Sequence, residues 1–151
     1  MSQEKLDCYI IPSEPLPLLL PIECVAEVLS KPQIDALDDA RAKWMHGHVN
    51  WRSQRLPVMS YSSLQDDSLD ESSKKEPLLV VLNPIPSAAR KAYSGLLCFG
   101  GVKQISIDAS IVLGEIPEDM DRRYVESVVS IEGSEFVIPK LSALGVAFTY
   151  F

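Results

Sequence analysis

The sequence predicts a mainly β protein, and three observations lead to that class. Eleven prolines against seven glycines in 151 residues divide the chain into short elements, because proline removes a backbone donor and fixes φ. Short apolar runs alternate with turn residues at close intervals, as they do in β-barrels and sandwiches. The 46% hydrophobic and 23% charged residues are ordinary values for a folded chain. We expect about nine short strands and two or three helical turns.

The first third of the chain contains two expected strands and two expected helical turns. Apolar runs at 9–11 and 18–20 suggest strands joined by a proline-rich turn. Apolar residues at helical spacing over 22–29 indicate a short helix or helical turn. An Asp N-cap followed by good helix formers indicates another turn over 38–45, with Gly47 as its candidate C-cap.

The middle of the chain is predicted to contain a hairpin, a loop and a buried strand. The runs 49–52 and 55–61 suggest two strands joined by a short turn. Pro57 should then sit at a sheet edge or a bulge, because it cannot donate to a strand ladder. The acidic stretch 65–77 is polar and is expected to be a solvated loop. The continuous apolar run 78–82 is typical of a strand buried on both faces.

The last third of the chain continues the strand-rich pattern. Further strands are expected at 93–99 and 102–107. A hairpin is expected over 124–138, with its turn at 132–134. Residues 141–144 indicate a terminal helical turn.

The charge and the cysteines restrict the compartment and the partners. The net charge is −7, from 14 basic and 21 acidic residues, so nucleic acid and an anionic membrane surface are poor partners. The first seven residues are polar and lack the apolar core of a signal peptide. Three cysteines, an odd number in apolar surroundings, suit a reducing compartment. We therefore expect a cytoplasmic location and no membrane insertion.

No residue pattern in the sequence predicts a catalytic site or a metal site. His46 and His48 alternate and could face one way, but a zinc site needs three or four ligands. Cys98 could pair with a histidine, yet it lies in an apolar strand pattern where a thiol is normally inert. The segment 99–102 contains two adjacent glycines but lacks the lysine of a phosphate loop. The acidic residues around Pro117 lack the regular alternation of a calcium loop. We expect no metal, no cofactor and no catalytic residue, hence a binding module rather than an enzyme.

Six segments carry motifs whose order and spacing are characteristic of one family. They include a V-x-E-V element, a tryptophan-rich segment ending in Trp51-Arg52, and an L-P-V strand, and they lie at 25–28, 44–52, 56–58, 78–83, 95–105 and 131–138. Together they resemble the CheW-like family of chemosensory coupling proteins over about residues 6–147. The resemblance implies two small five-stranded SH3-like β-barrels that share an apolar core, with short helices. It also implies one domain over 6–151 behind a flexible N-terminus at 1–5.

The resemblance also implies a function. CheW-like proteins are adaptors that join the regulatory domain of a CheA-type histidine kinase to the cytoplasmic tips of methyl-accepting chemoreceptors. Residues 10–12, 18–21 and 51–61 resemble most closely the ChpC type, which belongs to the chemosensory system linked to type IV pili. The alternatives are a scaffold or regulatory domain of another two-component pathway and, more remotely, a small Cys/His enzyme.

Six residues fall on the positions at which the family contacts its partners. The kinase-contacting positions hold Val25, Glu27 and Gly47, and the receptor-contacting positions hold Arg52, Val102 and Ile105. Gly47 would allow a close backbone approach, and Arg52 would offer a planar fork of donors. Core packing, a surface salt bridge and a helix C-cap are the structural alternatives for these residues. Ser53 stands where the family usually has glycine, and the 65–77 loop is longer than expected, so the receptor contact could differ here.

Overall fold

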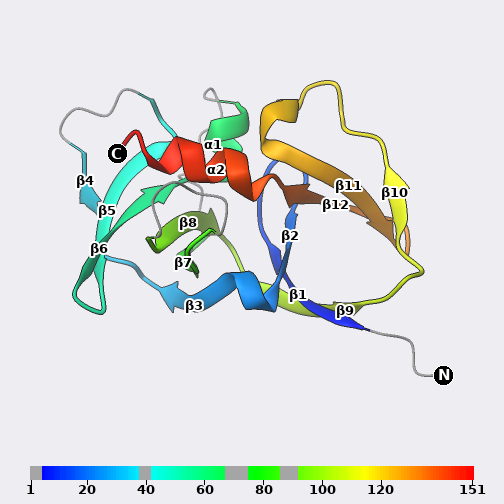
Figure 1. The fold of residues 1–151 in the computed structure, drawn as a ribbon, viewed down its shortest axis with the longest axis horizontal. Helices are drawn as coiled ribbons and strands as arrows, with labels where there is room; N and C mark the ends of the chain where they lie inside the picture. Colours follow the sequence, from blue (N-terminus) through cyan, green and yellow to red (C-terminus); the bar gives the residue numbers. More distant parts are fainter. Residues whose placement is uncertain (1–4, 38–41, 67–74, 86–91) are drawn as a thin grey trace.

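The computed structural model describes residues 5–37, 42–66, 75–85 and 92–151, and these residues form two six-stranded sheets (Figure 1). The first sheet has the order β10 (Val112–Gly114), β11 (Val125–Ile131), β12 (Ser134–Pro139), β2 (Leu18–Pro21), β1 (Leu6–Ile11) and β9 (Lys103–Ile107). The second has the order β3 (Val25–Ser30), β7 (Pro77–Leu82), β8 (Ser94–Phe99), β6 (Gln54–Met59), β5 (Met45–Trp51) and β4 (Asp35–Ala36). The helical elements are η1 (Ile22–Cys24), α1 (Tyr61–Gln65), η2 (Arg122–Tyr124) and α2 (Leu141–Phe148).

The mainly β class is confirmed, with one more strand in each sheet than the five expected. The additional strands are the shortest ones, β4 with two residues and β10 with three, and both lie at sheet edges. Strands this short carry too few residues for a period-2 pattern to be visible in the sequence.

The longer strands follow from local sequence. The last four residues of β7, the expected doubly buried strand, are at most 1% exposed. The β11–β12 hairpin closes with Glu132 and Gly133 at φ 50° and 85°, the positive values that a two-residue type I′ turn requires. The C-terminal helix α2 was expected at 141–144 and extends to Phe148.

One expected helical feature is confirmed only in part, and another is wrong. Residues 22–29 form only one 3-10 turn before β3 begins, and β3 pairs antiparallel with β7. Apolar spacing in so short a run is compatible with either state, and pairing with the buried β7 decides in favour of a strand. Gly47 is not a helix C-cap, because it lies inside strand β5.

One helix was not expected, and some expected features lie outside the described residues. Helix α1 begins at Tyr61, the last residue of the predicted strand 55–61, and continues to Gln65. Its N-cap Ser60 accepts a hydrogen bond from the Ser63 backbone N–H. Residues 1–4, 38–41 and 67–74 are not described. The expected N-terminal segment, most of the acidic loop and the start of the turn at 38–45 therefore lie outside the described part of the chain.

Pro57 lies in β6, which is an interior strand by sheet order. The strand nevertheless pairs with β8 only through Val58 and Met59. At Pro57 one side faces His48 of β5 and the other side has no ladder partner among the described residues. The expectation of a local edge therefore holds for this residue, although the strand itself is not an edge strand.

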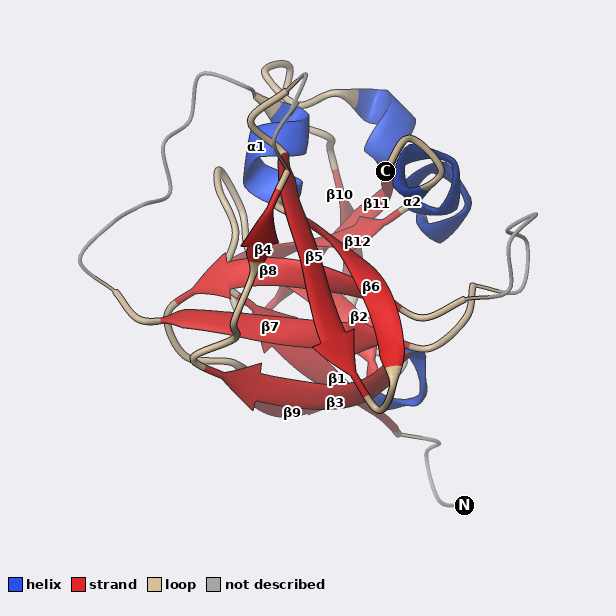
Figure 2. Cartoon of the chain, turned by 90° about the vertical axis from the view of Figure 1, so that its left-hand side faces the viewer, coloured by secondary structure: helices blue, strands red, loops and turns tan. Residues whose placement is uncertain are grey.

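The two sheets share one hydrophobic core. Its largest cluster contains Leu18 and Val128 from the first sheet, Val80 and Leu96 from the second, and Leu144 from α2. Figure 1 shows α2 lying across both sheets, and Figure 2 shows the second sheet from its own side. Two smaller clusters lie within the individual sheets. The shared core that the family resemblance implied is thus present.

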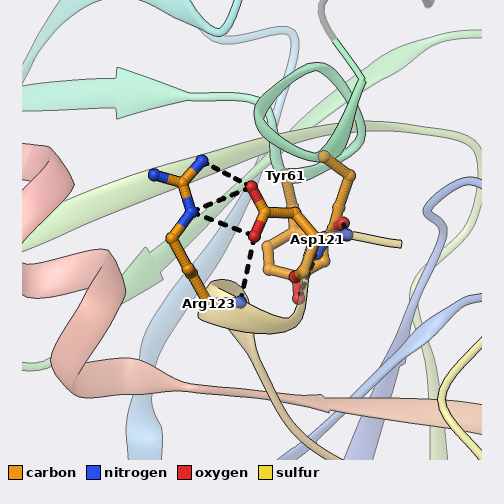
Figure 3. A network of polar contacts seen from close by, with 4 residues as sticks. Tyr61, Asp121 and Arg123 are labelled. Carbon is orange, nitrogen blue, oxygen red and sulfur yellow. Dashed lines mark hydrogen bonds and ion pairs between the residues drawn. The ribbon is translucent and has the colours of Figure 1, made fainter. Parts of the chain in front are cut away.

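A polar network joins α1, which lies between β6 and β7 of the second sheet in the chain, to η2, which directly precedes β11 of the first (Figure 3). The Tyr61 hydroxyl donates to the Tyr124 carbonyl at 2.5 Å and accepts from Gln65 Nε2 at 3.1 Å. Gln65 Oε1 accepts from the Asp121 backbone N–H. The Asp121 carboxylate binds the Arg123 guanidinium, with a shortest contact of 2.6 Å. Burial raises the pKa of Tyr61 to about 12, so the hydroxyl stays protonated and available as a donor.

Candidate partner-binding surfaces

The edge strand β3 and the tip of the β5–β6 hairpin form one exposed surface. Arg52 Nη2 lies 3.3 Å from Glu27 Oε1. The Arg52 guanidinium also lies over the Trp51 ring, 4.4 Å from its centroid. Arg52 and Ser53 form the two-residue turn of the hairpin, at φ 47° and 63°. Ser53 therefore adopts a left-handed conformation that glycine would adopt without strain.

The structure brings together two residues that the sequence analysis assigned to different partners. Glu27 and Arg52 are paired to each other, with side chains 34% and 65% exposed. A pair this exposed contributes about 0 to 1 kcal/mol to stability. The two side chains are thus easily separated. The ion pair also uses only one of the five N–H donors of the arginine. Both charged groups remain available to a partner.

The other two kinase-facing candidates are structural in the free chain. Val25 is the first residue of β3, stands opposite Leu82 and packs against the shared core. Gly47 is buried at φ 143°, and a Cβ there would lie 2.0 Å from the Asp35 carbonyl oxygen. Only glycine tolerates that approach. The close approach expected from a partner is made instead by strand β4 of the same chain.

The remaining receptor-facing candidates lie on the other sheet. Val102 immediately precedes the edge strand β9 and packs against the shared core, and Ile105 lies within β9 opposite Cys8. Both are half-buried. Figures 1 and 2 place β9, β3 and the tip of the β5–β6 hairpin along the same lower margin of the molecule, away from α2. Five of the six candidates therefore belong to this side of the fold, whereas Gly47 lies toward the other end of β5, opposite Ala36 of β4.

The two histidines lie on strand β5, and Cys98 lies inside the shared core. Residues 46 and 48 lie on one face of β5, as their alternation predicts. The His48 ring meets Phe151 edge-on, with centroids 5.9 Å apart. Burial, with a smaller effect of Arg55, lowers the pKa of His48. Cys98 is 2% exposed inside the shared core. Among the described residues no three His, Cys, Asp or Glu side chains are grouped as metal ligands would be.

Sequence reasoning missed two exposed apolar positions on the first sheet and two at the C-terminal helix. Val112 and Leu113 of β10 are 63% and 75% exposed, and Val146 and Tyr150 are 59% and 68% exposed. Little in the sequence indicated the exposed residues of β10, because the segment around this strand has no alternation of apolar and polar residues that would separate an inward from an outward face.

These elements define a class of protein: two β-sheets that share one core, crossed by a C-terminal helix, with a charged surface between the edge strand β3 and the β5–β6 hairpin. Within residues 5–37, 42–66, 75–85 and 92–151, no helix is long and apolar enough to cross a membrane.

The family model described as CheW-like domain matches residues 12–146, and the chain belongs to this family. Among solved structures, the scaffolding protein TtCheW from Thermoanaerobacter tengcongensis is similar in fold, with a TM-score of 0.74. It is 19% identical in sequence, and the alignment covers 91% of this chain and 90% of that one. No curated protein matches the chain.

Proposed function

We propose that this chain is a cytoplasmic, non-enzymatic adaptor that couples chemoreceptor tips to the regulatory domain of a CheA-type histidine kinase. The observation that carries the proposal is the CheW-like domain over residues 12–146. The fold similarity to a protein described as a scaffolding protein supports the same role. Exposed, paired charges beside a half-buried apolar strand are suited to reversible association, because such charges steer encounter and can re-pair across an interface.

The kinase contact is proposed at Glu27, with Val25 holding β3 against the core and Gly47 allowing β4 to approach β5. Glu27 lies on an edge strand, where backbone groups are also open to a partner. The hydrogen bond that Glu27 accepts from Arg52 in the free chain is replaced by one from the kinase.

The receptor contact is proposed at Arg52, Val102 and Ile105. The Arg52 guanidinium provides a planar fork for a carboxylate or for carbonyl oxygens. Val102 and Ile105 contribute apolar surface on which one helix of a receptor tip can lie. Because Glu27 and Arg52 are paired in the free chain, the kinase contact and the receptor contact adjoin. Binding of either partner separates the pair and frees the other charged residue for the second partner.

The pilus-linked ChpC subtype is part of the proposal, and it rests on the sequence segments 10–12, 18–21 and 51–61. Deletion of the gene is expected to abolish surface twitching and to leave flagellar swimming intact. Loss of swimming with intact twitching would overturn the subtype.

Titration calorimetry with the CheA-type kinase of the same organism tests the adaptor role. We expect a Kd below about 100 µM, in the range of transient signalling contacts. No heat of binding at high micromolar concentration would refute the proposal.

The Arg52→Ala variant tests the separation of the two contacts. It is expected to bind the kinase with unchanged or improved affinity, since Glu27 is no longer paired, and to weaken receptor binding about tenfold. Arg122→Ala is the matched control, because Arg122 is exposed and lies in η2 outside the proposed surfaces. Equal loss of both partners in Arg52→Ala would contradict the separation.

A further inference from the structure

A pocket of about 280 Å³ lies between the outer face of the β5–β6 hairpin, the start of β8 and the C-terminal helix α2. Its walls are mainly apolar and aromatic, with Tyr93, Phe148 and Phe151 among them. His48, Arg55 and Ser94 also line it. One wall is formed by α2, which Figure 1 places on the upper side of the molecule, away from β3 and β9. The pocket is therefore separate from the proposed partner surface.

Two buried polar atoms at the pocket have no hydrogen-bond partner among the described residues. They are the Ser94 hydroxyl oxygen and His48 Nδ1. Ser94 is only 3% exposed, so bulk water does not satisfy its hydroxyl. Native proteins pair the great majority of buried polar groups. Both atoms are themselves covered, so a small turn of the Ser94 and His48 side chains toward the pocket would let a ligand group complete their bonding.

The charge around the pocket selects the ligand. None of the lining residues carries a carboxylate, and Arg55 supplies one guanidinium. Asp35 accepts from Arg55 Nη1 at 3.2 Å, which leaves the other N–H groups of the guanidinium free to donate. The lowered pKa of His48 keeps its imidazole neutral at pH 7, so it can present an N–H at the unpartnered nitrogen. Three side chains with donor groups thus line one pocket, and an anionic acceptor suits them.

The volume and the walls define the rest of the ligand. A cavity of about 150 Å³ holds benzene, so a pocket of this size has room for about eleven non-hydrogen atoms by the same ratio. Aromatic walls favour a flat apolar body. We propose that this pocket binds a small free aromatic carboxylate, with its carboxylate at Ser94, Arg55 and His48 and its ring among Tyr93, Phe148 and Phe151.

The probe for the test is 3-phenylpropionate, which has the expected size. Its binding to the full chain is measured by calorimetry and mapped by amide chemical shifts. We expect saturable binding, with shifts at Ser94 and in α2, and at least about tenfold weaker binding of the neutral analogue 3-phenyl-1-propanol. Equal affinity for acid and alcohol, or shifts confined to other regions, would overturn the proposal.

Variants separate the pocket from nonspecific binding. Arg55→Gln and Ser94→Ala are each expected to weaken 3-phenylpropionate binding about tenfold, whereas Arg122→Gln is the control and binds as the wild type does. Ala92 is exposed and lines the pocket, so Ala92→Trp fills it without disturbing the core and is expected to abolish binding. Undiminished binding in Ala92→Trp would refute the site.

A further arm distinguishes a free acid from the end of a partner protein. N-acetyl-Gly-Gly-Phe carries the same aromatic carboxylate on a short peptide. We expect it to bind no better than 3-phenylpropionate, since the pocket has no room for the peptide body. Tenfold tighter binding of the peptide would overturn the assignment to a free small acid.

Discussion

Removal of one hydroxyl, in Tyr61→Phe, tests the link between the two sheets. The hydroxyl donates to the Tyr124 carbonyl and accepts from Gln65 Nε2. Its loss leaves both of these part-buried groups without that partner, and an unmade hydrogen bond of this kind costs about 1–3 kcal/mol. We expect urea unfolding at pH 8 to show a free energy of unfolding lower by about 1–2 kcal/mol. Tyr150→Phe is the matched control, because Tyr150 is 68% exposed.

The pH dependence of the same variant has a sign that can be worked out. Tyr61 ionises near 10.0 when unfolded and at about 12 when folded. The unfolded chain therefore loses this proton first, and stability is present below pH 10 and is lost as pH rises to 12. The full effect is about 2.7 kcal/mol, and about half of it, 1.4 kcal/mol, is lost by pH 11. The difference between wild type and Tyr61→Phe should shrink by that amount between pH 8 and pH 11. A constant difference over this range would refute the buried, hydrogen-bonded hydroxyl.

Two further predictions concern strand β5. Gly47→Ala should lower the free energy of unfolding by about 2–4 kcal/mol, because its Cβ would lie 2.0 Å from a backbone oxygen of β4. Gly101→Ala, with open space around its Cβ, is the control, and equal stability of the two variants would contradict the close approach. His48→Gln should reduce the loss of stability at acidic pH. The pKa of His48 is lowered in the folded chain, so the unfolded chain binds the proton first. The wild type therefore loses stability as pH falls through about 6.5. Thermal unfolding between pH 7.5 and 5 measures this, and identical slopes would exclude the burial of His48.

The strand content could be predicted because its signals are local. The apolar run at 78–82 and the turn at Glu132 and Gly133 each carry enough chemistry to specify a strand and a hairpin without any distant contact. The CheW-like assignment was reached in the same way, from motifs in a characteristic order, and the family match over 12–146 confirms it. Helix α1 also had a local signal, the capping serine Ser60, that was not used.

Other features depended on contacts between distant segments. The stretch 22–29 has a spacing that suits a helix, but β3 forms because its backbone pairs with the open edge of β7, about fifty residues away in the sequence. Gly47 was correctly associated with a close backbone approach, but only the docking of β4 shows which backbone approaches it.

The sequence by itself determined the class of fold, the family, the absence of net positive charge, and the residue types available for partner contact. These depend on composition and on periodicities within a few residues. The tertiary structure alone decided that Glu27 and Arg52, which the sequence analysis assigned to different partners, face each other. It also placed Arg55, Ser94 and Phe151 around one pocket. Residues from different strands and a terminal helix come into contact only when the shared core forms, so no local sequence pattern can predict these contacts.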